Sequence, residues 1–389
     1  MADTIRPRDA GELRQAVEWV LAEGLTLDVR GRGSKLALGR PMRCDAVLDL
    51  SGLSGVVDYA PEELVVTLRA GTPLEEIEAL LAQRNQMLAF EPPDFGPLLG
   101  LESGQGTLVG AVMGNLAGPR RVSGGAARDH LLGFSGVNGR GEAFKSGGRV
   151  MKNVTGYDLS KLVAGSWGTL AVLDEVSVKV LPAPDQTSTL LLRGLADDTA
   201  VRAMCTAMGS PHDVSGAAHL GDRTALRIEG VAPSVEARIK GLRELLAPIG
   251  AELEELGTLE SRAFWRDVRD VVPLRAGAND VIWKISCPPT EGPEVVKRIK
   301  AERHGAEAFY DWSGGLVWLA LPASADADHV LVRAALGTSG GHATLIRAPE
   351  AVRAGVPVFQ PLSPALAALA ARVKESFDPQ GLFNPGRMA

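Results

Sequence analysis

The chain has 389 residues, of which 45% are hydrophobic and 23% are charged, and its formal net charge is −6. This length exceeds what one compact core holds, so we expect two or three globular domains, and the acidic balance argues against a nucleic-acid surface spread over the whole molecule. The three cysteines lie far apart and form no CxxC pair, which excludes a cysteine cradle for zinc or an iron–sulfur cluster within the chain.

The N-terminus carries charges where a secretion signal needs an apolar stretch. No uncharged apolar run reaches the roughly 18 residues that a membrane-spanning helix requires. We therefore expect a cytoplasmic protein without direct membrane insertion. Attachment to a membrane through partner subunits is compatible with the sequence.

The first part of the chain alternates helix and strand signals. Residues 9–23 show apolar side chains at helical spacing after the capping residue Asp9, and Gly24 ends the pattern. Residues 25–31 predict a short strand, and residues 45–71 predict a strand, a turn and a second strand.

Residues 72–86 predict a second helix with a well-marked start. Thr72 is the N-cap candidate, Pro73 occupies the first helical position, and Glu75 completes a capping box. Further on, residues 131–148 read as strand, glycine-rich turn and strand, which predicts a β-hairpin.

The second half of the chain has a different pattern of strand and helix signals. Residues 156–184 predict a short helix, a glycine turn and a strand, and Pro182 and Pro184 mark a domain boundary. Residues 186–345 alternate strand-like runs with amphipathic helices, which predicts one sheet with helices on one face. The last segment, 364–389, predicts a helix and an ordered tail.

The most informative stretch is SGQGTLVGAVMGNLAGPRR at 103–121, in which Gly106, Gly110, Gly114 and Gly118 recur every four residues. Because glycine inside a helix costs about 0.5–1 kcal/mol relative to alanine, four of them on one predicted helical face need a reason. One reason is tight packing of two helices. The other is a bare backbone surface held against a flat or anionic ligand.

A second glycine turn favours the ligand interpretation. Gly104 and Gly106 precede the predicted helix, so backbone N–H groups at its start can face a phosphate. The turn RGRGSK, Arg30–Lys35, follows a predicted strand and places two glycines between cations. It matches neither the dinucleotide fingerprint nor the P-loop, but it is typical of an anion nest. The two turns together predict one diphosphate ligand held from two sides.

These motifs, with GYDLSKLVAGSWGTLAVLDEVSVKV and FDPQGLFNPGRM further on, come in the order found in flavoproteins of the vanillyl-alcohol oxidase/PCMH type. The chain resembles that family over nearly its whole length. Within it, YDWSGGLVWLAL and GHATLIRAPEAVRAGVPVFQP are similar to motifs of the FAD-binding E subunits of bacterial glycolate oxidases. The resemblance implies an α+β fold. Its parts are a PCMH-type FAD-binding domain of two α+β subdomains at 1–182, a cap domain with an antiparallel sheet at 183–345, and a segment at 346–389 that returns to the FAD domain.

The resemblance, carried over position by position, implies a set of FAD-binding residues. The first pyrophosphate loop is Arg30, Gly31, Arg32, Gly33, Ser34 and Lys35. The second contact is Ser103, Gly104, Gln105, Gly106, Thr107, Gly110 and Ala111, with Asn115, Gly118 and Pro119 near the flavin. Toward the adenine lie Gly165, Gly168, Thr169 and Val172, and toward the ring system Asn384 and Arg387.

Two departures from the family pattern carry expectations. Covalent flavin attachment in this superfamily commonly uses a histidine in the first loop, and Ser34 stands there, so we expect non-covalent FAD. Related D-2-hydroxyacid dehydrogenases resemble one another in a metal site near a "HxGDGNxH"-like run, which is absent here. His219 and Asp222 in AHLGDR only echo that run, and we assign them to a turn between cap strands and expect no metal.

Oxidation of a 2-hydroxy acid needs a cation for the carboxylate and a base for the hydroxyl proton. Candidate cations are Arg120, Arg121, Arg347 and Arg387, and candidate bases are His130, Tyr157 and His342. Each also has a structural explanation, so no catalytic residue is assigned. Trp312 and Trp318 suit a sheet core better than a substrate-facing wall, or else anchor a partner subunit.

The resemblance implies an FAD-binding subunit of a glycolate oxidase-type complex. Such a subunit takes part in flavin-mediated oxidation of glycolate, a small 2-hydroxy acid, to glyoxylate, and passes electrons to a partner. The implied partners are a catalytic flavoprotein subunit and an iron–sulfur subunit, with no nucleic acid. Two alternatives remain: a self-sufficient FAD-dependent oxidoreductase of a hydroxy acid or polyol, and a non-catalytic scaffold with a flavin-type fold.

Overall fold

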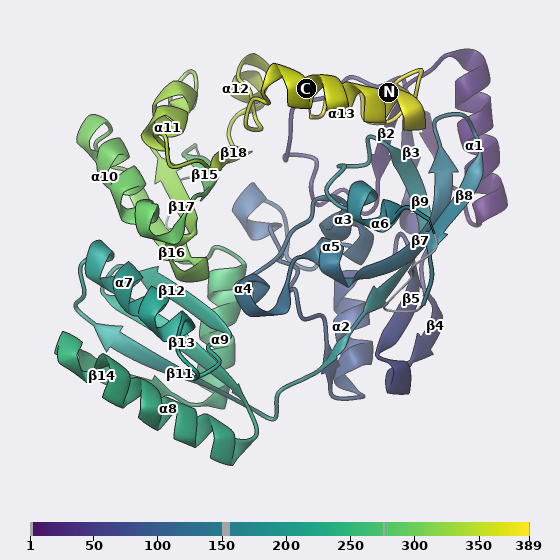
Figure 1. The fold of residues 1–389 in the computed structure, drawn as a ribbon. Helices are drawn as coiled ribbons and strands as arrows, with labels where there is room; N and C mark the ends of the chain where they lie inside the picture. Colours follow the sequence, from purple (N-terminus) through teal and green to yellow (C-terminus); the bar gives the residue numbers. More distant parts are fainter. Residues whose placement is uncertain (1–2, 150–155, 275–276, 278, 389) are drawn as a thin grey trace. The chain divides into compact units, whose positions relative to one another are not determined.

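The computed structural model describes residues 3–149, 156–274, 277 and 279–388, which form two compact units (Figure 1). The units are built from several chain segments. The first comprises Met1–Ala117, Ala126–Ala183 and Pro361–Ala389, and the second comprises Gly118–Gly125 and Pro184–Gln360. The last division falls at residue 360 because the segment before it pairs into the second unit, where Leu345 N–H donates to the Val358 carbonyl at 2.9 Å.

Within the described residues, the first unit holds a parallel sheet, a five-stranded antiparallel sheet and a two-stranded antiparallel sheet. The parallel sheet has the order β1-β3-β2, the antiparallel sheet has the order β4-β5-β9-β7-β8, and β6 pairs with β10. The bounds are β1 Asp3–Ile5, β2 Leu27–Arg30, β3 Ala46–Asp49, β4 Val56–Ala60, β5 Val65–Arg69, β6 Gln86–Met87, β7 Leu131–Asn138, β8 Ala143–Gly147, β9 Ala171–Lys179 and β10 Leu181–Pro182. The pairing of β7 with β8 confirms the hairpin predicted at 131–148.

Except for α13, none of whose residues is buried, the α-helices of the first unit bury apolar side chains in one core with the sheets. The first follows its sequence signals closely: Asp9 accepts from Glu12 N–H at 2.8 Å, and Gly24 closes the helix at φ +66°. The bounds are α1 Ala10–Glu23, α2 Leu74–Ala82, α3 Leu108–Met113, α5 Ala127–His130, α6 Leu159–Val163 and α13 Pro364–Phe377.

The predicted cap of the second helix is wrong. α2 begins at Leu74, with Pro73 as its N-cap in an extended conformation and no capping side chain. The Thr72 hydroxyl is used elsewhere: it accepts from Gly55 N–H at 3.0 Å and donates to the Arg69 carbonyl at 2.7 Å. Thr72 therefore joins the helix start to the preceding strands.

The glycine-rich stretch forms a much shorter helix than its four-residue spacing predicts. α3 covers Leu108–Met113, with Thr107 as its N-cap and Gly114 as its C-cap, and Asn115 follows in the left-handed conformation at φ +46°. The expected helical face of four glycines is therefore wrong. Gly110 lies inside the helix, whereas Gly106, Gly114 and Gly118 lie outside it. Glycine and asparagine both accept the backbone angles that end a helix, and here they end it early.

The second unit is built on an antiparallel sheet that, in the described part of the chain, has eight strands in the order β14-β11-β13-β12-β16-β17-β15-β18 (Figure 1). This confirms the antiparallel sheet expected for the cap. The strands are β11 Gln186–Arg193, β12 Gly216–Leu220, β13 Arg223–Gly230, β14 Glu252–Leu256, β15 Val281–Ser286, β16 Glu307–Asp311, β17 Leu316–Leu321 and β18 His342–Arg347. The helices are α4 Arg121–Gly124, α7 Asp197–Met208, α8 Ala232–Leu246, α9 Thr258–Arg269, α10 Gly292–Glu302, α11 His329–Ala335 and α12 Glu350–Gly355.

Helices cover both faces of this sheet, so the expectation of helices on one face is wrong. Apolar residues of α7, α8, α10 and α11 share one core with Leu190 and Leu192 of β11. Thr189, the residue before Leu190, points to the other face, where its hydroxyl meets Ser261 and Trp265 of α9 at 2.6 and 2.8 Å. Successive residues of β11 thus serve two different faces of the sheet.

Candidate functional site

The loop after β2 separates two adjoining hollows of the first unit. The first, which we call the main cleft, is lined by residues 30–36 together with parts of α3, the start of β9 and the C-terminal tail. The outer groove lies on the other side of the loop and is lined by residues 30–34 and Leu36, by β1 and β3, and by Gln105. Twelve of the FAD-binding residues that the resemblance implies line the main cleft: Arg30, Gly31, Arg32, Gly33, Ser34, Lys35, Thr107, Gly110, Gly168, Val172, Asn384 and Arg387.

The two glycine turns meet at this cleft. A Cβ atom on Gly31 would lie 2.9 Å from Thr107 Oγ1, so only glycine allows the first turn to approach the start of α3 so closely. The Arg32 guanidinium donates to the Gln105 side chain at 3.4 Å, which joins the two turns a second time. Bare backbone from two distant parts of the sequence therefore borders one cleft, as the sequence predicted.

Lys35 supplies a buried cation between the turns. Its ammonium group lies 3.5 Å from the point where a Cβ of Gly110 would be, and it donates to Ser34 Oγ at 3.3 Å. Burial lowers the pKa of Lys35 to about 8, and the Asp94 carboxylate opposes this shift only in part. A buried cation whose charge is this costly gains from an anionic ligand.

Asp94 is a site residue that sequence reasoning missed. Its carboxylate accepts from Ser103 Oγ at 2.6 Å, from Gly104 N–H at 2.8 Å and from Gly96 N–H at 3.0 Å. Burial alone would raise the pKa of Asp94, but these hydrogen bonds and Lys35 hold it below its ordinary value. Ser103 and Gly104 thus hold the second turn in place through Asp94, and neither lines the main cleft.

The C-terminal tail closes one end of the cleft. Asn384, which is 2% exposed, accepts from Val29 N–H and donates to the Trp167 carbonyl, both at 2.8 Å. A Cβ on Gly168 would lie 2.7 Å from the Asn384 amide nitrogen, so glycine is needed at that position. Asn384 therefore fixes the turn that presents Trp167 to the cleft.

Arg387 adds a second cation at the same end. It is 6% exposed, it donates to the Lys35 carbonyl at 2.8 Å, and its guanidinium carbon lies 5.8 Å from the centre of the Trp167 ring. The tail itself is held by Lys374, which contacts Asp378 at 2.5 Å and donates to the Thr169 carbonyl at 2.6 Å. Residues far apart in sequence thus place Lys35 and Arg387 side by side.

The remaining residues of the implied set do not line the main cleft. Gln105 borders the outer groove, and Ala111 is buried on α3. The Asn115 side chain accepts from Arg128 N–H at 3.1 Å, and Thr169 donates to the Ser166 carbonyl at 2.6 Å. The others are Gly106 at the second turn, Gly165 in the turn before β9, and Gly118 and Pro119, which group with the second unit.

Sequence reasoning also missed an apolar wall of the main cleft. Its members are Val29, Leu36, Leu50, Ala70, Val109, Met113, Trp167, Ala171 and Leu173. Such residues cannot be told from core residues in the sequence, because lining a cleft and filling a core need the same side chains.

This donor set fits FAD. The diphosphate carries two negative charges, and the cleft offers two buried cations and glycine backbone that a Cβ would obstruct. The flat ring system suits the apolar wall. Arg30 contributes less charge, because its guanidinium already pairs with Asp28 at 2.5 Å.

Similarity to known proteins agrees with this fit. The family model described as "FAD binding domain" matches residues 2–147, and the model described as "FAD linked oxidases, C-terminal domain" matches residues 360–388. Glycolate oxidase subunit GlcE of Escherichia coli K12 is 37% identical over 376 residues, which cover 97% of this chain and 96% of that protein. The chain belongs to the FAD-linked oxidase family.

Two further relatives bear on the fold and on possible partners. Glycolate oxidase subunit GlcD of Bacillus subtilis is 30% identical over 189 residues, which cover 48% of this chain and 38% of that protein. The crystal structure of p-cresol methylhydroxylase, the protein abbreviated PCMH, matches with a TM-score of 0.73 at 12% identity and covers 99% of this chain and 88% of its own. That likeness shows the fold alone, and it is the α+β PCMH-type fold that the sequence predicted.

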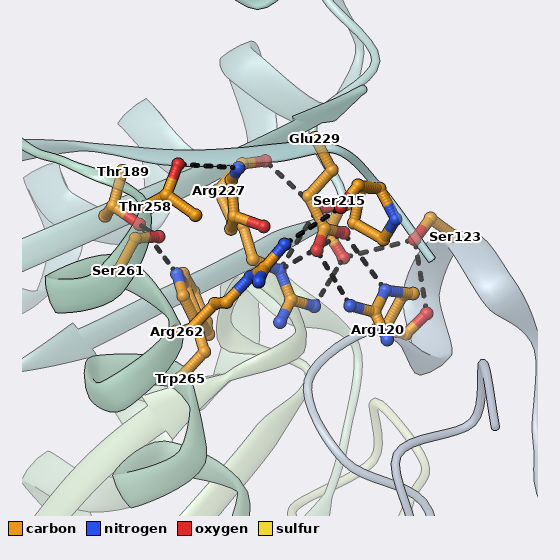
Figure 2. Close-up of polar contacts among 12 residues, drawn as sticks. Arg120, Ser123, Thr189, Ser215, Arg227, Glu229, Thr258, Ser261, Arg262 and Trp265 are labelled. Carbon is orange, nitrogen blue, oxygen red and sulfur yellow. Dashed lines mark hydrogen bonds and ion pairs between the residues drawn. The ribbon is translucent and has the colours of Figure 1, made fainter. Parts of the chain in front are cut away.

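Arg120, a candidate carboxylate clamp, already has a carboxylate in the second unit. Figure 2 shows its guanidinium against Glu229, with contacts of 3.0 and 2.8 Å to the two carboxylate oxygens, and 11% of each side chain is exposed. Burial alone would raise the pKa of Glu229, but Arg227 and Arg120 hold it at about 2. Arg120 therefore anchors its segment to β13 and is not available as a clamp.

Arg227 completes this network, and its position in the sequence could have revealed it. The side chain is 2% exposed, donates to Ser215 Oγ at 3.1 Å and lies 4.7 Å from the centre of the Trp265 ring (Figure 2). In TALRIEG, Arg227 and Glu229 occupy alternate positions of an apolar strand. Two opposite charges on one face of a buried strand are a signal of a buried ion pair.

The other candidate residues have structural roles or lie away from the cleft. AHLGDR does contain the turn between β12 and β13, and Asp222 lies in it, but His219 lies within β12; His219 is 1% exposed and hydrogen-bonds Thr224 at 2.9 Å. His130 is buried against the Phe90 ring at 5.4 Å, whereas Tyr157 is 93% exposed. Arg347 donates to the Asp280 carbonyl at 3.2 Å.

The described residues offer neither a cluster of metal ligands nor a membrane-spanning helix. Among them, no three or more histidine, cysteine, aspartate or glutamate side chains lie where they could hold a metal ion together. Asp222 pairs with Arg193 at 3.5 Å. No helix in the described part of the chain has both the length and the apolar character needed to cross a membrane.

Proposed function

We propose that this chain is the FAD-binding subunit of a glycolate oxidase-type complex that oxidises a small 2-hydroxy acid, glycolate, to glyoxylate. The observation that carries the proposal is that similarity to an E subunit covers 97% of the chain, while the Arg30–Lys35 turn and the start of α3 line one cleft. When bound, FAD would supply the redox chemistry by taking up electrons that leave the substrate.

The protein's part in this chemistry is to hold the cofactor. In the proposal, the peptide N–H groups of the Arg30–Lys35 turn, with Lys35 and Arg387, bind the diphosphate. Trp167 and Met113 pack against the ring system, and Asn384 keeps the tail and the Gly168 turn in register. Ser34 offers no ring nitrogen for a covalent bond to the flavin, so FAD is held non-covalently and can dissociate.

The partners in the proposal are a catalytic flavoprotein subunit related to the GlcD subunit and an iron–sulfur subunit. An exposed apolar surface at the start of α13 supports such a complex: Leu362 just before the helix and Leu366 and Leu369 on it are 55, 54 and 48% exposed, and alanines stand between the last two. Apolar residues gathered on one exposed helix are typical of a subunit interface, and we assign this one to the flavoprotein partner. The complex works in the cytoplasm, and any membrane attachment comes through the partner subunits.

Purification of the chain alone tests the proposal. We expect a yellow protein that releases its FAD on heat denaturation and that turns over glycolate negligibly until partner subunits are added. Fast turnover by the lone chain would instead establish the self-sufficient oxidoreductase. A colourless protein that does not take up added FAD would establish the scaffold.

A further inference from the structure

We propose that Lys284, Arg121 and Trp312 of the second unit form a binding site for the carboxylate group of a small organic acid. The identity of that acid as a 2-hydroxy acid rests on the proposed function. The anion-binding chemistry itself rests on the geometry of these residues. We call Lys284, Arg121, Trp312 and Trp318 the lysine cluster.

Lys284 lies on the face of the sheet that points away from the core formed with α7, α8, α10 and α11. It lies in the middle of β15, pairs with Trp318 of β17 on one side and with Thr344 of β18 on the other, and therefore shares a face with both. Its neighbours along the strand, Trp283 and Ile285, point to the other face and belong to the core under the helices. A lysine on this face, beside a tryptophan that is 4% exposed, needs a reason.

A strained turn places a second tryptophan over Lys284. Trp312 and the next two residues, Ser313 and Gly314, all have left-handed backbone angles, with φ of +51°, +61° and +97°. Asp311 holds this turn by accepting from Trp312 N–H at 2.7 Å, and the indole N–H of Trp312 donates to the Gly118 carbonyl at 3.1 Å. Strain held in place by such contacts is concentrated at functional sites.

Two cations share the Trp312 ring. The Arg121 guanidinium carbon lies 4.9 Å from the ring centre and the Lys284 ammonium nitrogen lies 5.1 Å from it, and the same ammonium is 5.9 Å from the centre of the Trp318 ring. Arg121 comes from α4, the short helix of the segment Gly118–Gly125 that belongs to this unit. The rings stabilise the cations but give the ammonium hydrogens no acceptor.

Lys284 differs from the neighbouring cations in having no anion. In the described part of the structure its ammonium group makes no hydrogen bond and no ion pair, whereas Arg120, next to Arg121 in the chain, has the full carboxylate of Glu229. Burial and the nearby Arg121 lower the pKa of Lys284 to about 8, against the pull of Asp311. A carboxylate beside Lys284 would accept hydrogen bonds from its ammonium group and would add negative charge next to the two cations.

The surroundings define the class of ligand. A guanidinium and an ammonium beside one ring suit a planar carboxylate. Thr344, beside Lys284 on the same face, adds a hydroxyl that suits a hydroxyl of the ligand. These features together match the carboxylate and the hydroxyl group of a hydroxy acid.

The test is direct binding of oxalate, a small acid that a flavin cannot oxidise by hydride transfer, measured by calorimetry on the FAD-loaded full chain. Lys284→Met keeps the length of the side chain and removes its charge, and we expect the Kd of oxalate to rise at least about tenfold. Lys284→Arg should keep most of the affinity. Lys240→Met, which changes a lysine with 80% of its side chain exposed on α8, is the matched control and should leave the Kd unchanged.

The pH dependence of oxalate binding gives a second measurement that needs no variant. The groups that face Lys284 are Arg121 from α4, Asp311 at the end of β16 and His342 at the start of β18. Burial, Lys284 and Arg121 lower the pKa of His342 below its ordinary value, so His342 is neutral from pH 7 upward. Oxalate affinity should therefore fall as pH rises from 7 to 9, because Lys284 loses its proton.

The outcomes separate this inference from the proposed function. An FAD-loaded chain that binds no oxalate, or binds it equally well as Lys284→Met or at pH 7 and pH 9, overturns the inference and leaves the flavin assignment intact. A chain that binds oxalate through Lys284 but takes up no FAD supports the site and overturns the proposed function. If Lys284→Met does not fold, the Lys284→Arg variant and the pH series decide the question.

Discussion

Two buried lysines, Lys35 in the first unit and Lys284 in the second, show two ways of preparing a protein for an anion. Burial lowers the pKa of each to about 8. Lys35 sits among glycine turns whose backbone offers N–H donors, and Ser34 accepts one of its hydrogens. Lys284 lies near two tryptophan rings with Arg121 as its neighbour, and its ammonium group makes no hydrogen bond in the described structure. The first arrangement recognises a phosphate group largely through backbone, and the second recognises a carboxylate through charge alone.

The largest effect should come from blocking the backbone arrangement. In Gly31→Val, the new Cβ lies 2.9 Å from Thr107 Oγ1, so the two glycine turns must separate. We expect the purified variant to hold less than about a tenth of the parent's FAD, because a diphosphate can no longer contact both turns. The absorbance ratio at 450 and 280 nm measures this.

Gly148→Ala is the control for that substitution. A Cβ on Gly148, in the same unit, meets nothing within 4 Å, so flavin content should not change. Full flavin content in Gly31→Val would show that the two turns do not bind one ligand.

The next largest effect should come from removing the carboxylate of Glu229, which pairs with Arg120, whereas Lys284 has no such carboxylate partner in the described structure. Glu229→Gln removes the carboxylate that Arg120 and Arg227 share, and we expect a loss of stability on the order of 3 kcal/mol, because two buried arginines lose their counter-charge. Thermal unfolding followed by circular dichroism measures it. Glu254→Gln, which breaks an exposed pair with Arg193, should cost less than about 1 kcal/mol.

The same carboxylate sets a pH dependence. The folded pKa of Glu229, about 2, lies below its ordinary value of 4.5. Its contribution to stability is therefore fully present above pH 4.5 and is lost as pH falls toward 2. The parent should lose stability over this window, and Glu229→Gln should lose less. Equal slopes for the two proteins would contradict the shifted pKa.

A smaller effect tests the cation of the backbone arrangement. Lys35→Met removes one charge-assisted contact to the diphosphate, worth about 1.5–3 kcal/mol, so FAD affinity should fall roughly 10- to 100-fold. Titration of the apoprotein with FAD, followed by flavin fluorescence, measures it. The exposed Lys145 offers the control Lys145→Met, which should bind FAD like the parent. An unchanged affinity in Lys35→Met would mean that Lys35 does not face the diphosphate.

The difference between the two arrangements also explains what the sequence could and could not reveal. Recognition by backbone excludes side chains, so it leaves glycines at readable positions, and Gly31 and Gly110 were predicted as site residues for that reason. Recognition by side chains leaves no such pattern: Lys284 is one lysine in VIWKIS, and it becomes notable only when strand pairing sets it beside Trp318. The approach of Arg121 from α4 depends on tertiary contacts that no local pattern encodes.

The errors of prediction have the same origin. The four-residue glycine spacing predicted one long helical face, but α3 ends at Met113, because local backbone preference at Asn115 outweighed the periodicity. Thr72 carries the signature of an N-cap, yet its hydroxyl binds backbone groups of the preceding strands. In both cases the residues have the chemical property that the local pattern indicated, a side-chain-free backbone or a hydroxyl that binds backbone groups. The structure uses that property at a different place from the one predicted.

The smallest effect is a gain in stability, and it separates a functional lysine from a structural one. The folded pKa of Lys284, about 8, lies below its ordinary value of 10.5, so at neutral pH the folded chain holds a buried charge at a cost that unfolding would relieve. Lys284→Met removes that cost, and the Tm of the ligand-free chain should rise by roughly 2–4 °C at pH 7. Because the unfolded chain binds the extra proton between pH 8 and 10.5, the parent should gain stability with rising pH in that window, and the stability advantage of Lys284→Met should shrink.

Saturating oxalate should make the parent the more stable of the two proteins, since only the parent gains free energy from the bound carboxylate. A variant that is less stable than the parent at pH 7 without ligand would show that Lys284 serves the fold, and the contrast with Lys35 as a second anion site would fail.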